Sequence, residues 1–274
     1  MNRVQRYAEY SRRLGPLARF VLRNSHTHFR EIRSHLSEKY VRGNGIEVGA
    51  GDYPMPLSPQ STVTYVDRVP REIYAKQYHL DPSYMVVPSV LCEADKLPFP
   101  DDSLDFVIAN HVIEHLENPL SGLSDWLRVL KPNGILVLGV PNRRANEYDF
   151  ERRPESIEHL AHCSSKLEHL REFVEIVDEL PQGSHGFEER FRTYREEDRR
   201  IHFHVFDAQS VLELLTHVRT TLGIPVTLLR AFHFKYGFEM IFVLRKSHGS
   251  VKTRAWDGVR NATLLAHSSF LGWM

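Results

Sequence analysis

The chain has 274 residues, of which 42% are hydrophobic and 26% charged, so it can form one large domain or one domain with a sizeable insertion. Lys+Arg and Asp+Glu balance at 35 each, which argues against non-specific binding of nucleic acid or of anionic membranes. The two cysteines, Cys92 and Cys163, form no CxxC pair, so we expect neither a disulfide framework nor a thiolate zinc site. This usage fits a reducing compartment and predicts a cytoplasmic protein.

The N-terminal segment, residues 1–42, is basic and amphipathic, and we expect helices there with a break at Gly15-Pro16. It lacks the apolar core and cleavage site of a signal peptide. No apolar run in the sequence is long enough for a membrane span, so we expect no stable membrane insertion. Two interpretations stay open: helices that cover a sheet edge, or helices that bind a membrane surface.

Five short apolar runs follow, and most are continuous rather than alternating, as in strands buried on both faces of a parallel sheet. They span residues 46–50, 62–67, 89–95, 104–110 and 135–141. Between the last two runs, four leucines share one face of a predicted helix that ends at Pro132-Asn133-Gly134: Leu120, Leu123, Leu127 and Leu130. Alternating strands and helices predict a doubly wound α/β domain.

Residues 142–200 interrupt this alternation and are rich in Arg, Glu and His. We interpret them as a helical insertion, with one helix over about 155–180 and a looser stretch after it. Asp207 is the predicted N-cap of the next helix. Runs 225–234 and 238–246 are separated by only a few residues, which predicts an antiparallel hairpin. The predicted parts are N-terminal helices (1–42), a main domain (43–246) with the insertion (142–200), and a weakly patterned tail (247–274).

The stretch "GIEVGAGDYP" places a glycine-rich turn directly after the first apolar run. A dinucleotide fingerprint needs a third glycine where Pro54 stands, and a P-loop needs a lysine that is missing. Gly49 and Gly51 leave room for a ligand against the backbone. Glu47 belongs to neither pattern. Its carboxylate could accept hydrogen bonds from an ammonium-bearing ligand, or it could brace the loop.

Further acidic residues close the next two runs and indicate a nucleoside ligand. Asp67 ends the second run, where a carboxylate can bind two ribose hydroxyls. In "EADKLPF", Glu93 or Asp95 could accept a hydrogen bond from an adenine amino group, and the register between them stays open.

Together, "EVGAG", "VD", "EADKLPFPDDSLDFVIANHVIEHLENP" and "RVLKPNGILVLGVPN" resemble the class I S-adenosylmethionine-dependent methyltransferases over about residues 40–142, in particular the ubiquinone-type and small-molecule subgroup. The resemblance implies a Rossmann-like, mostly parallel seven-stranded sheet with an antiparallel final hairpin, and S-adenosylmethionine as cofactor. The cofactor-binding residues that it implies lie at the strand ends: Glu47, Gly49, Ala50 and Gly51 on the methionine side, Asp67 and Arg68 at the ribose, Glu93 and Ala94, or Asp95, at the adenine, and Asn110 and His111 near the reactive methyl. His115 belongs to a motif of the family, which implies a structural or cofactor-adjacent role for it.

Four histidines are candidate general bases for the methyl transfer: His111, His202, His204 and, in the insertion, His159. In "IHFHVF", His202 and His204 share one face of an extended segment, which is also compatible with a half-buried strand. His111 and His115 are spaced like a pair of metal ligands, but no third ligand is identifiable, so we expect no metal.

The acceptor is predicted to be a small molecule bound by the arginine-rich stretch 140–160, which could equally be a solvated charge run. This stretch resembles segments of methyltransferases encoded near glycan-assembly genes, which implies methylation of an oxygen on a sugar or sugar-linked acceptor. The alternative function is a cofactor-binding but catalytically silent regulatory or scaffold protein. An NAD-dependent enzyme is disfavoured by Pro54, and the oligomeric state stays open.

Overall fold

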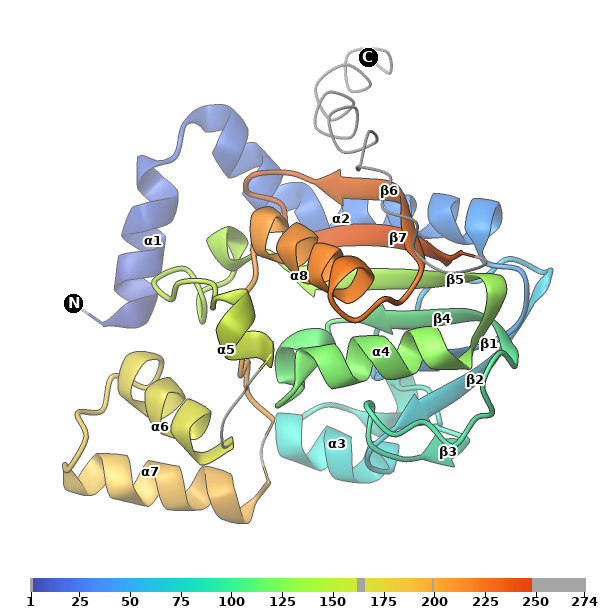
Figure 1. Cartoon of the computed structure of the whole chain (residues 1–274). Helices are drawn as coiled ribbons and strands as arrows, with labels where there is room; N and C mark the ends of the chain where they lie inside the picture. Colours follow the sequence, from blue (N-terminus) through green and yellow to red (C-terminus); the bar gives the residue numbers. More distant parts are fainter. Residues whose placement is uncertain (1, 162–165, 199, 248–274) are drawn as a thin grey trace.

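The computed structural model describes residues 2–161, 166–198 and 200–247. Its centre is a seven-stranded sheet in the order β3-β2-β1-β4-β5-β7-β6, in which β7 runs in the direction opposite to the other six strands. Figure 1 shows the sheet with helices on both sides. The predicted doubly wound α/β fold with an antiparallel final hairpin is therefore confirmed. The strands are β1 (Gly43–Val48), β2 (Ser61–Asp67), β3 (Val90–Leu91), β4 (Leu104–Asn110), β5 (Leu130–Pro141), β6 (Val226–His233) and β7 (Glu239–Lys246).

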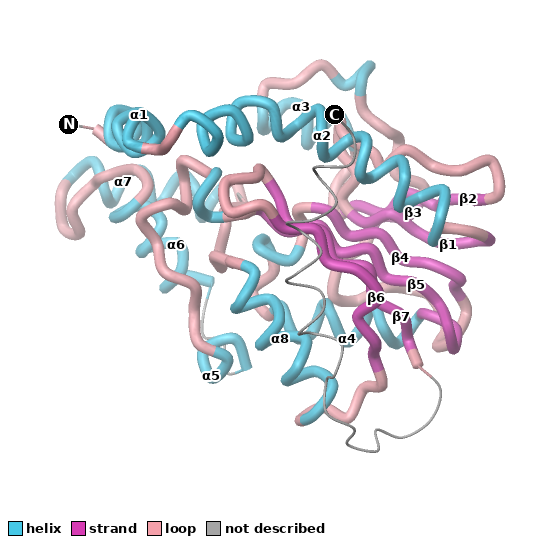
Figure 2. The backbone as a smooth tube through the Cα atoms, turned by 90° about the horizontal axis from the view of Figure 1, so that it is seen from above, coloured by secondary structure: helices cyan, strands magenta, loops and turns pink. Residues whose placement is uncertain are grey.

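Two layers of helices cover the sheet, as the view in Figure 2 shows. Helices α2 (Pro16–Tyr40) and α3 (Arg71–Tyr78) lie on one side, and α4 (Pro119–Val129) and α8 (Ala208–Thr220) on the other. Alternate residues of β4 face the two helix layers. Phe106 and Ile108 pack with α2, whereas Val107 and Ala109 pack in the core under α4 and α8. This two-sided burial explains the continuous apolar runs.

Two element boundaries differ from the prediction. The run at 89–95 forms a strand only over β3, because just Val90 and Leu91 pair with β2. Helix α4 ends at Val129, before the predicted stop, because Leu130 already pairs with Leu104 of β4. Residues 49–60, between β1 and β2, form turns and no helix, so the glycine turn leads into a loop.

The insertion contains α5 (Ile157–Ala161), α6 (Lys166–Ile176) and α7 (His185–Glu196). The single helix expected over 155–180 is wrong, since α5 and α6 are separate helices on either side of residues 162–165, which lie outside the described part. The looser stretch expected at 181–200 is also wrong. Helix α7 starts at the Ser184 cap and buries Phe187, Phe191 and Tyr194 against α6 in a separate apolar cluster.

The N-terminal helices α1 (Arg3–Arg13) and α2 do not cover a sheet edge. Helix α2 packs on a sheet face through Phe29 and Leu36, and α1 lies against the insertion. Arg6 of α1 pairs there with Glu151 at 2.7 Å and Glu179 at 2.5 Å. No helix among the described residues has the length and apolarity that a membrane crossing requires.

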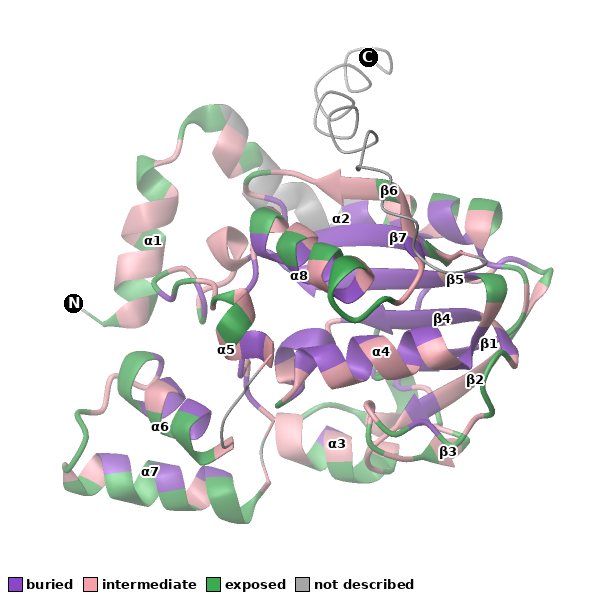
Figure 3. Ribbon diagram, in the orientation of Figure 1, coloured by how far each residue is buried: buried purple, intermediate pink, exposed green. Residues whose placement is uncertain are grey.

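Residues 201–206 are not a half-buried strand, because they form an irregular segment in which every residue except His202 is buried. The Asp207 prediction is confirmed: its carboxylate accepts hydrogen bonds from the Gln209 and Ser210 N–H groups and caps α8. Figure 3 shows buried central strands and a buried face of α4, in contrast to the exposed outer surface of α7. Of the predicted tail, residues 248–274 lie outside the described part.

Candidate active site

The candidate site lies at the carboxyl ends of β1 and β4, where the strand order changes direction. Strand β1 has β2 on one side and β4 on the other, and this switch point is where open α/β sheets bind ligands. The glycine turn after β1 has the backbone that its sequence suggested, since φ is 64° at Gly49 and 54° at Gly51. A Cβ at Gly49 would lie 3.0 Å from Cγ2 of Val112, so a side chain there would press on the end of β4.

Glu47 lies beneath this turn and is only 1% exposed. Its Oε1 accepts a hydrogen bond from the Met55 N–H at 2.9 Å, which braces the loop after the turn. Its Oε2 is buried and has no hydrogen-bond partner among the described residues. Burial raises the pKa of Glu47 to about 7, against the opposing effects of the Met55 N–H, the Arg33 charge and the Asn110 side chain. The bracing role is therefore visible, and the second oxygen fits an ammonium group.

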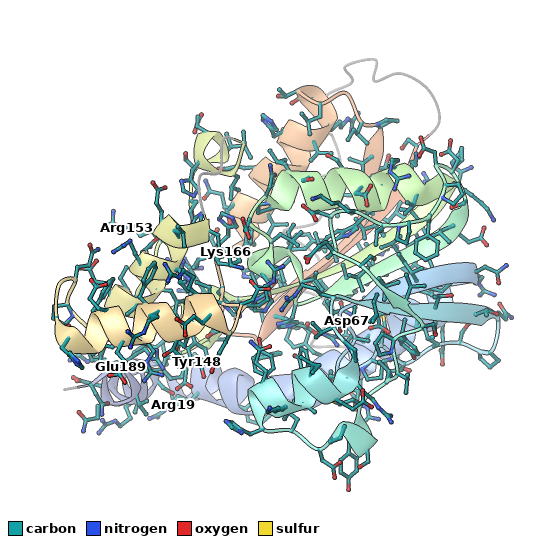
Figure 4. The ribbon with its side chains drawn as sticks, turned by 90° about the horizontal axis from the view of Figure 1, so that it is seen from below. Arg19, Asp67, Tyr148, Arg153, Lys166 and Glu189 are labelled. Carbon is teal, nitrogen blue, oxygen red and sulfur yellow. The ribbon has the colours of Figure 1, made fainter. Side chains whose placement is uncertain are left out.

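Asp67 ends β2, as predicted, and its carboxylate accepts a hydrogen bond from the Arg68 N–H at 2.7 Å. Burial raises its pKa, against the effects of backbone N–H groups and the Arg68 charge. Tyr74 of α3 closes this side, with its hydroxyl 3.7 Å from the position of a Cβ on Gly51. Figure 4 shows Asp67 at the strand ends, with Lys166 on the side of the insertion.

Two of the predicted cofactor residues contact the insertion. Arg68 pairs with Asp198 at 2.5 Å, and the exposed Glu93 pairs with Arg200 at 2.8 Å. Between Glu93 and the half-buried Asp95, the Ala94 carbonyl accepts a hydrogen bond from the Trp126 indole at 2.8 Å and is fixed by it. The insertion thus reaches the segment predicted to bind the adenosine.

Asn110 and His111 follow β4 directly and lie next to the glycine turn. Both amide atoms of Asn110 are buried without a well-formed hydrogen bond in the described part of the chain, and the amide lies close enough to Glu47 to lower the pKa of that carboxyl. A Cβ on Gly139 would come within 2.4 Å of Asn110 Oδ1, so the glycine makes room for this amide. His111 has a positive φ of 55°, which is uncommon for a residue with a side chain. Its ring stacks on Phe238 with centroids 5.0 Å apart.

A buried ion pair that sequence reasoning missed holds His111. His111 Nε2 lies 2.9 Å from Oε2 of Glu239 on β7, and Glu239 also pairs with Arg33 of α2 at 2.5 Å. Arg33 and Glu239 are almost completely buried. The bonds from Arg33 and His111 outweigh the effect of burial and lower the pKa of Glu239. The sequence did contain a signal for this pair: Arg33 and Glu239 are charged residues that interrupt the apolar patterns of α2 and β7.

A second group of side chains surrounds Glu114. This residue lies in the short 3-10 turn η2 (Ile113–His115), which begins two residues after His111. Glu114 Oε1 lies 3.7 Å from His111 Nδ1 and 3.9 Å from His115 Nε2. His202 reaches the same place from the far side of the insertion, and its ring centroid lies 4.8 Å from that of His115. The expected absence of a metal rested on a missing third ligand, and the structure supplies Glu114 and His202 as neighbours of His115.

The remaining predicted base candidates belong to a different cluster. His159 of α5, His169 of α6 and His204 lie together, with ring centroids of His169 and His204 4.7 Å apart. His204 is completely buried, and its Nε2 lies 3.2 Å from the Glu117 carbonyl oxygen. The predicted shared face of His202 and His204 is therefore wrong, because the two rings join separate clusters. Burial lowers the pKa of His204 to about 3, which keeps its ring neutral.

The arginine-rich loop after β5 is partly structural. Arg152 is buried, pairs with Asp149 at 3.4 Å, and donates hydrogen bonds to the carbonyls of His202 and Phe203. It is thus committed to holding the segment that carries His202. Arg143 donates to the Arg152 carbonyl at 2.9 Å and supports the same turn.

The sheet order and the glycine turn at the strand ends define an α/β domain of the Rossmann-like type. Residues 46–138 match the family model described as a methyltransferase domain. The ubiquinone/menaquinone biosynthesis C-methyltransferase UbiE of Burkholderia mallei is 30% identical over 112 residues, which cover 38% of this chain and 46% of that protein. The chain therefore aligns with less than half the length of this relative.

Two solved structures illustrate the structural likeness. The N-methyltransferase NodS from Bradyrhizobium japonicum, in complex with S-adenosyl-L-homocysteine, has 15% identity and a TM-score of 0.45 over 81% of this chain and 87% of that one. A protein assigned to the Zn-dependent alcohol dehydrogenases of Rhodobacter sphaeroides has 18% identity and a TM-score of 0.49 over 79% and 89% of the two chains. With TM-scores below 0.5, no functional conclusion follows from these two structures.

The family model and the curated relative confirm the predicted resemblance over residues 46–138, which match a methyltransferase domain. The buried Glu47 oxygen without a hydrogen-bond partner and the open glycine turn fit the charged methionine end of S-adenosylmethionine. The individual contacts of the predicted cofactor residues stay predictions.

Proposed function

We propose that this protein transfers the methyl group of S-adenosylmethionine to an oxygen of a small sugar or sugar-linked acceptor. The observation that carries the proposal is the position of His111. His111 directly follows β4 at the strand ends, its Nδ1 lies 3.7 Å from Glu114, and Glu239 fixes the orientation of its ring. A base in that position serves a hydroxyl acceptor, whose own pKa is far above 7.

Different residues at the strand ends bind different parts of the cofactor. Asp67 binds the ribose, Glu47 and Asn110 bind the methionine end, and the backbone at Gly49 and Gly51 leaves space between them. When bound, S-adenosylmethionine supplies an electrophilic methyl group on a good leaving group. The protein therefore contributes mainly by aligning the acceptor oxygen with that methyl.

His111 is the residue we propose to take the proton of the acceptor. With its hydrogen on Nε2, the ring donates to Glu239 at 2.9 Å and leaves Nδ1 as the basic atom. The Arg33–Glu239 pair then holds the ring of His111 in one orientation, as the group that orients the base does in a catalytic triad. A general base of this kind contributes about 10²–10⁴-fold to the rate.

The acceptor pocket is assigned to the strand ends and to the insertion that faces them. The matched family segment, 46–138, ends before residue 142, so the matching part does not include the insertion. UbiE is named as a C-methyltransferase of ubiquinone and menaquinone biosynthesis, which makes a quinone-type carbon acceptor the second candidate. The buried carboxylates and histidines around His111 favour a polar, hydroxylated acceptor over an apolar quinone ring.

Methyl-labelled S-adenosylmethionine tests the proposal with a panel of sugars, nucleotide sugars, glycolipid headgroups and quinols. Label is expected in an oxygen of a sugar-type acceptor, and His111→Gln should lower turnover by tenfold or more. His35→Asn, at an exposed position on α2, is the matched control and should have no effect. Label on a quinol carbon would reject the acceptor class. Binding of S-adenosylhomocysteine without transfer to any acceptor would favour the silent protein, and binding of NAD alone would reject the family assignment.

A further inference from the structure

Glu114 is a buried carboxyl group whose neighbours do not satisfy its oxygens. It is 0% exposed, and neither carboxylate oxygen has a hydrogen-bond partner among the described residues. An isolated ionised carboxylate in such a place costs several kcal/mol unless a cation or a set of donors compensates it. The nearest groups are imidazole nitrogens of His111 and His115, at 3.7 and 3.9 Å, which is too far for hydrogen bonds.

Two histidines are oriented toward Glu114 by bonds at their opposite nitrogens. His115 Nδ1 lies 2.8 Å from the Ile201 carbonyl oxygen, and His202 Nδ1 lies 2.6 Å from Asp149 Oδ2. Both rings therefore have Nδ1 occupied and Nε2 available. A carbonyl or carboxylate on the far nitrogen is the usual support of a metal-binding histidine, because it fixes the tautomer and makes the ring a better ligand.

The three side chains also meet the distance requirement for a common ligand. One ligand atom each from Glu114, His115 and His202 lies within 4.8 Å of the other two. Bonds of about 2.1 Å to a metal place two ligands no more than about 4.2 Å apart, so small side-chain rotations would close the site.

We propose that Glu114, His115 and His202 bind a divalent transition-metal ion such as Zn²⁺, Mn²⁺ or Co²⁺. Two imidazoles and one carboxylate suit these ions better than Mg²⁺ or Ca²⁺, which prefer oxygen ligands only. Three protein ligands leave coordination positions open beside His111, and those positions suit hydroxyl groups of an acceptor. This role rests on the proposed function, whereas the metal site itself does not.

In the reaction, the bound cation lowers the pKa of the acceptor hydroxyl that it contacts. The proton of that hydroxyl passes to His111 Nδ1, and the oxygen forms the new bond to the methyl carbon. The carbon–sulfur bond breaks, and its electron pair stays on sulfur. The products are a methyl ether and S-adenosylhomocysteine, and the metal is neither oxidised nor reduced.

Two competing explanations need no metal: Glu114 could be protonated, since burial raises its pKa, or protonated His202 could compensate it. Burial lowers the pKa of His202, but the charge and hydrogen bond of Asp149 and the charge of Glu114 outweigh that effect and raise it. A second possible metal site, His159, His169 and His204, also has ligand atoms within 4.8 Å of one another. It lacks a carboxylate, so it carries no charge that requires a cation. These alternatives are separable by mutation.

The test is a Co²⁺ titration of the EDTA-treated full-length chain, followed by the visible absorption of the bound ion and by calorimetry. The wild type and His169→Asn are expected to bind one equivalent with similar affinity. Glu114→Gln and His202→Asn should bind at least tenfold more weakly. Glu114→Gln keeps the size and shape of the side chain, so it should remain folded by circular dichroism, and it should bind S-adenosylhomocysteine as the wild type does.

Three outcomes would overturn the proposal. The wild type could fail to bind Co²⁺, Zn²⁺ or Mn²⁺, or binding could survive Glu114→Gln and His202→Asn together. Binding could also depend on His169, which would place the metal in the second cluster. Methyl transfer at an unchanged rate in EDTA would overturn the role of the metal in the reaction, and it would leave the methyltransferase proposal intact.

Discussion

Replacing Glu47 by glutamine tests both the burial of this carboxylate and its role in cofactor binding. Burial raises the pKa of Glu47 from its ordinary value of 4.5 to about 7. Between those two pH values the folded protein holds a proton that the unfolded chain releases, so the stability contributed by Glu47 falls as the pH rises from about 4.5 through about 7. Since one pKa unit corresponds to about 1.4 kcal/mol, the loss amounts to about 3 kcal/mol.

Glutamine carries no charge at any pH, and its side-chain oxygen can still accept the hydrogen bond from the Met55 N–H. We therefore expect Glu47→Gln to be more stable than the wild type at pH 8 by up to about 3 kcal/mol, and to differ little at pH 4.5. Urea denaturation at the two pH values measures this difference. Glu38→Gln, at an exposed position on α2, is the control.

The same variant should bind the cofactor more weakly. A charge-assisted bond to the ammonium group contributes about 1.5–3 kcal/mol, so the affinity for S-adenosylhomocysteine should fall by about 10- to 100-fold. At pH 7 the wild type should also release about half a proton on binding, because the ammonium group ionises Glu47 fully. Calorimetry in buffers of different ionisation enthalpy measures both quantities. Parallel stability curves for wild type and variant would refute the burial argument, and binding without proton release would leave Glu47 with only its bracing role.

Three further predictions concern the ribose contact, the buried ion pair and the insertion. Asp67→Ala should weaken S-adenosylhomocysteine binding by about 1–3 kcal/mol with little change in unfolding free energy, because two ribose hydrogen bonds are lost; equal affinity by calorimetry would contradict the assignment. Arg33→Ala should destabilise the protein by about 3–5 kcal/mol, since it leaves Glu239 buried and unpaired, and the double variant Arg33→Met/Glu239→Gln should recover most of that loss in urea denaturation. Phe187→Ala should cost about 3–5 kcal/mol by opening a cavity between α6 and α7. If the melting temperature does not move, the insertion has no core that depends on this ring.

The sheet could be predicted from the sequence because its signal is local and repeated. Every strand is an apolar run, and run length and separation distinguished the parallel strands from the final hairpin. The acid at the end of β2 and the glycine turn after β1 are also local patterns. Their positions relative to each other follow from the parallel topology, so these parts of the site were predictable without tertiary information.

The histidine clusters were not predictable in the same way. His115 and His202 are 87 positions apart along the chain and meet only because the insertion folds back over the strand ends. The pattern of 201–206 suggested a strand, but this segment is almost completely buried, so both faces meet protein and the alternation carries no information about exposure. Helix α7 was missed because charged residues dominate its composition, although Phe187, Phe191 and Tyr194 have helical spacing.

The contacts between the insertion and the strand ends have a consequence for the order of events. Arg68–Asp198 and Glu93–Arg200 tie the acceptor-side segment to residues predicted to surround the nucleoside. Both carboxylates are nearly half exposed, so each pair contributes little, about 0–1 kcal/mol, and opens at low cost. If the nucleoside binds at these residues, we expect both ion pairs to open when it enters and to form again afterwards. The methyl donor would then bind before the acceptor, and the methylated product would leave first.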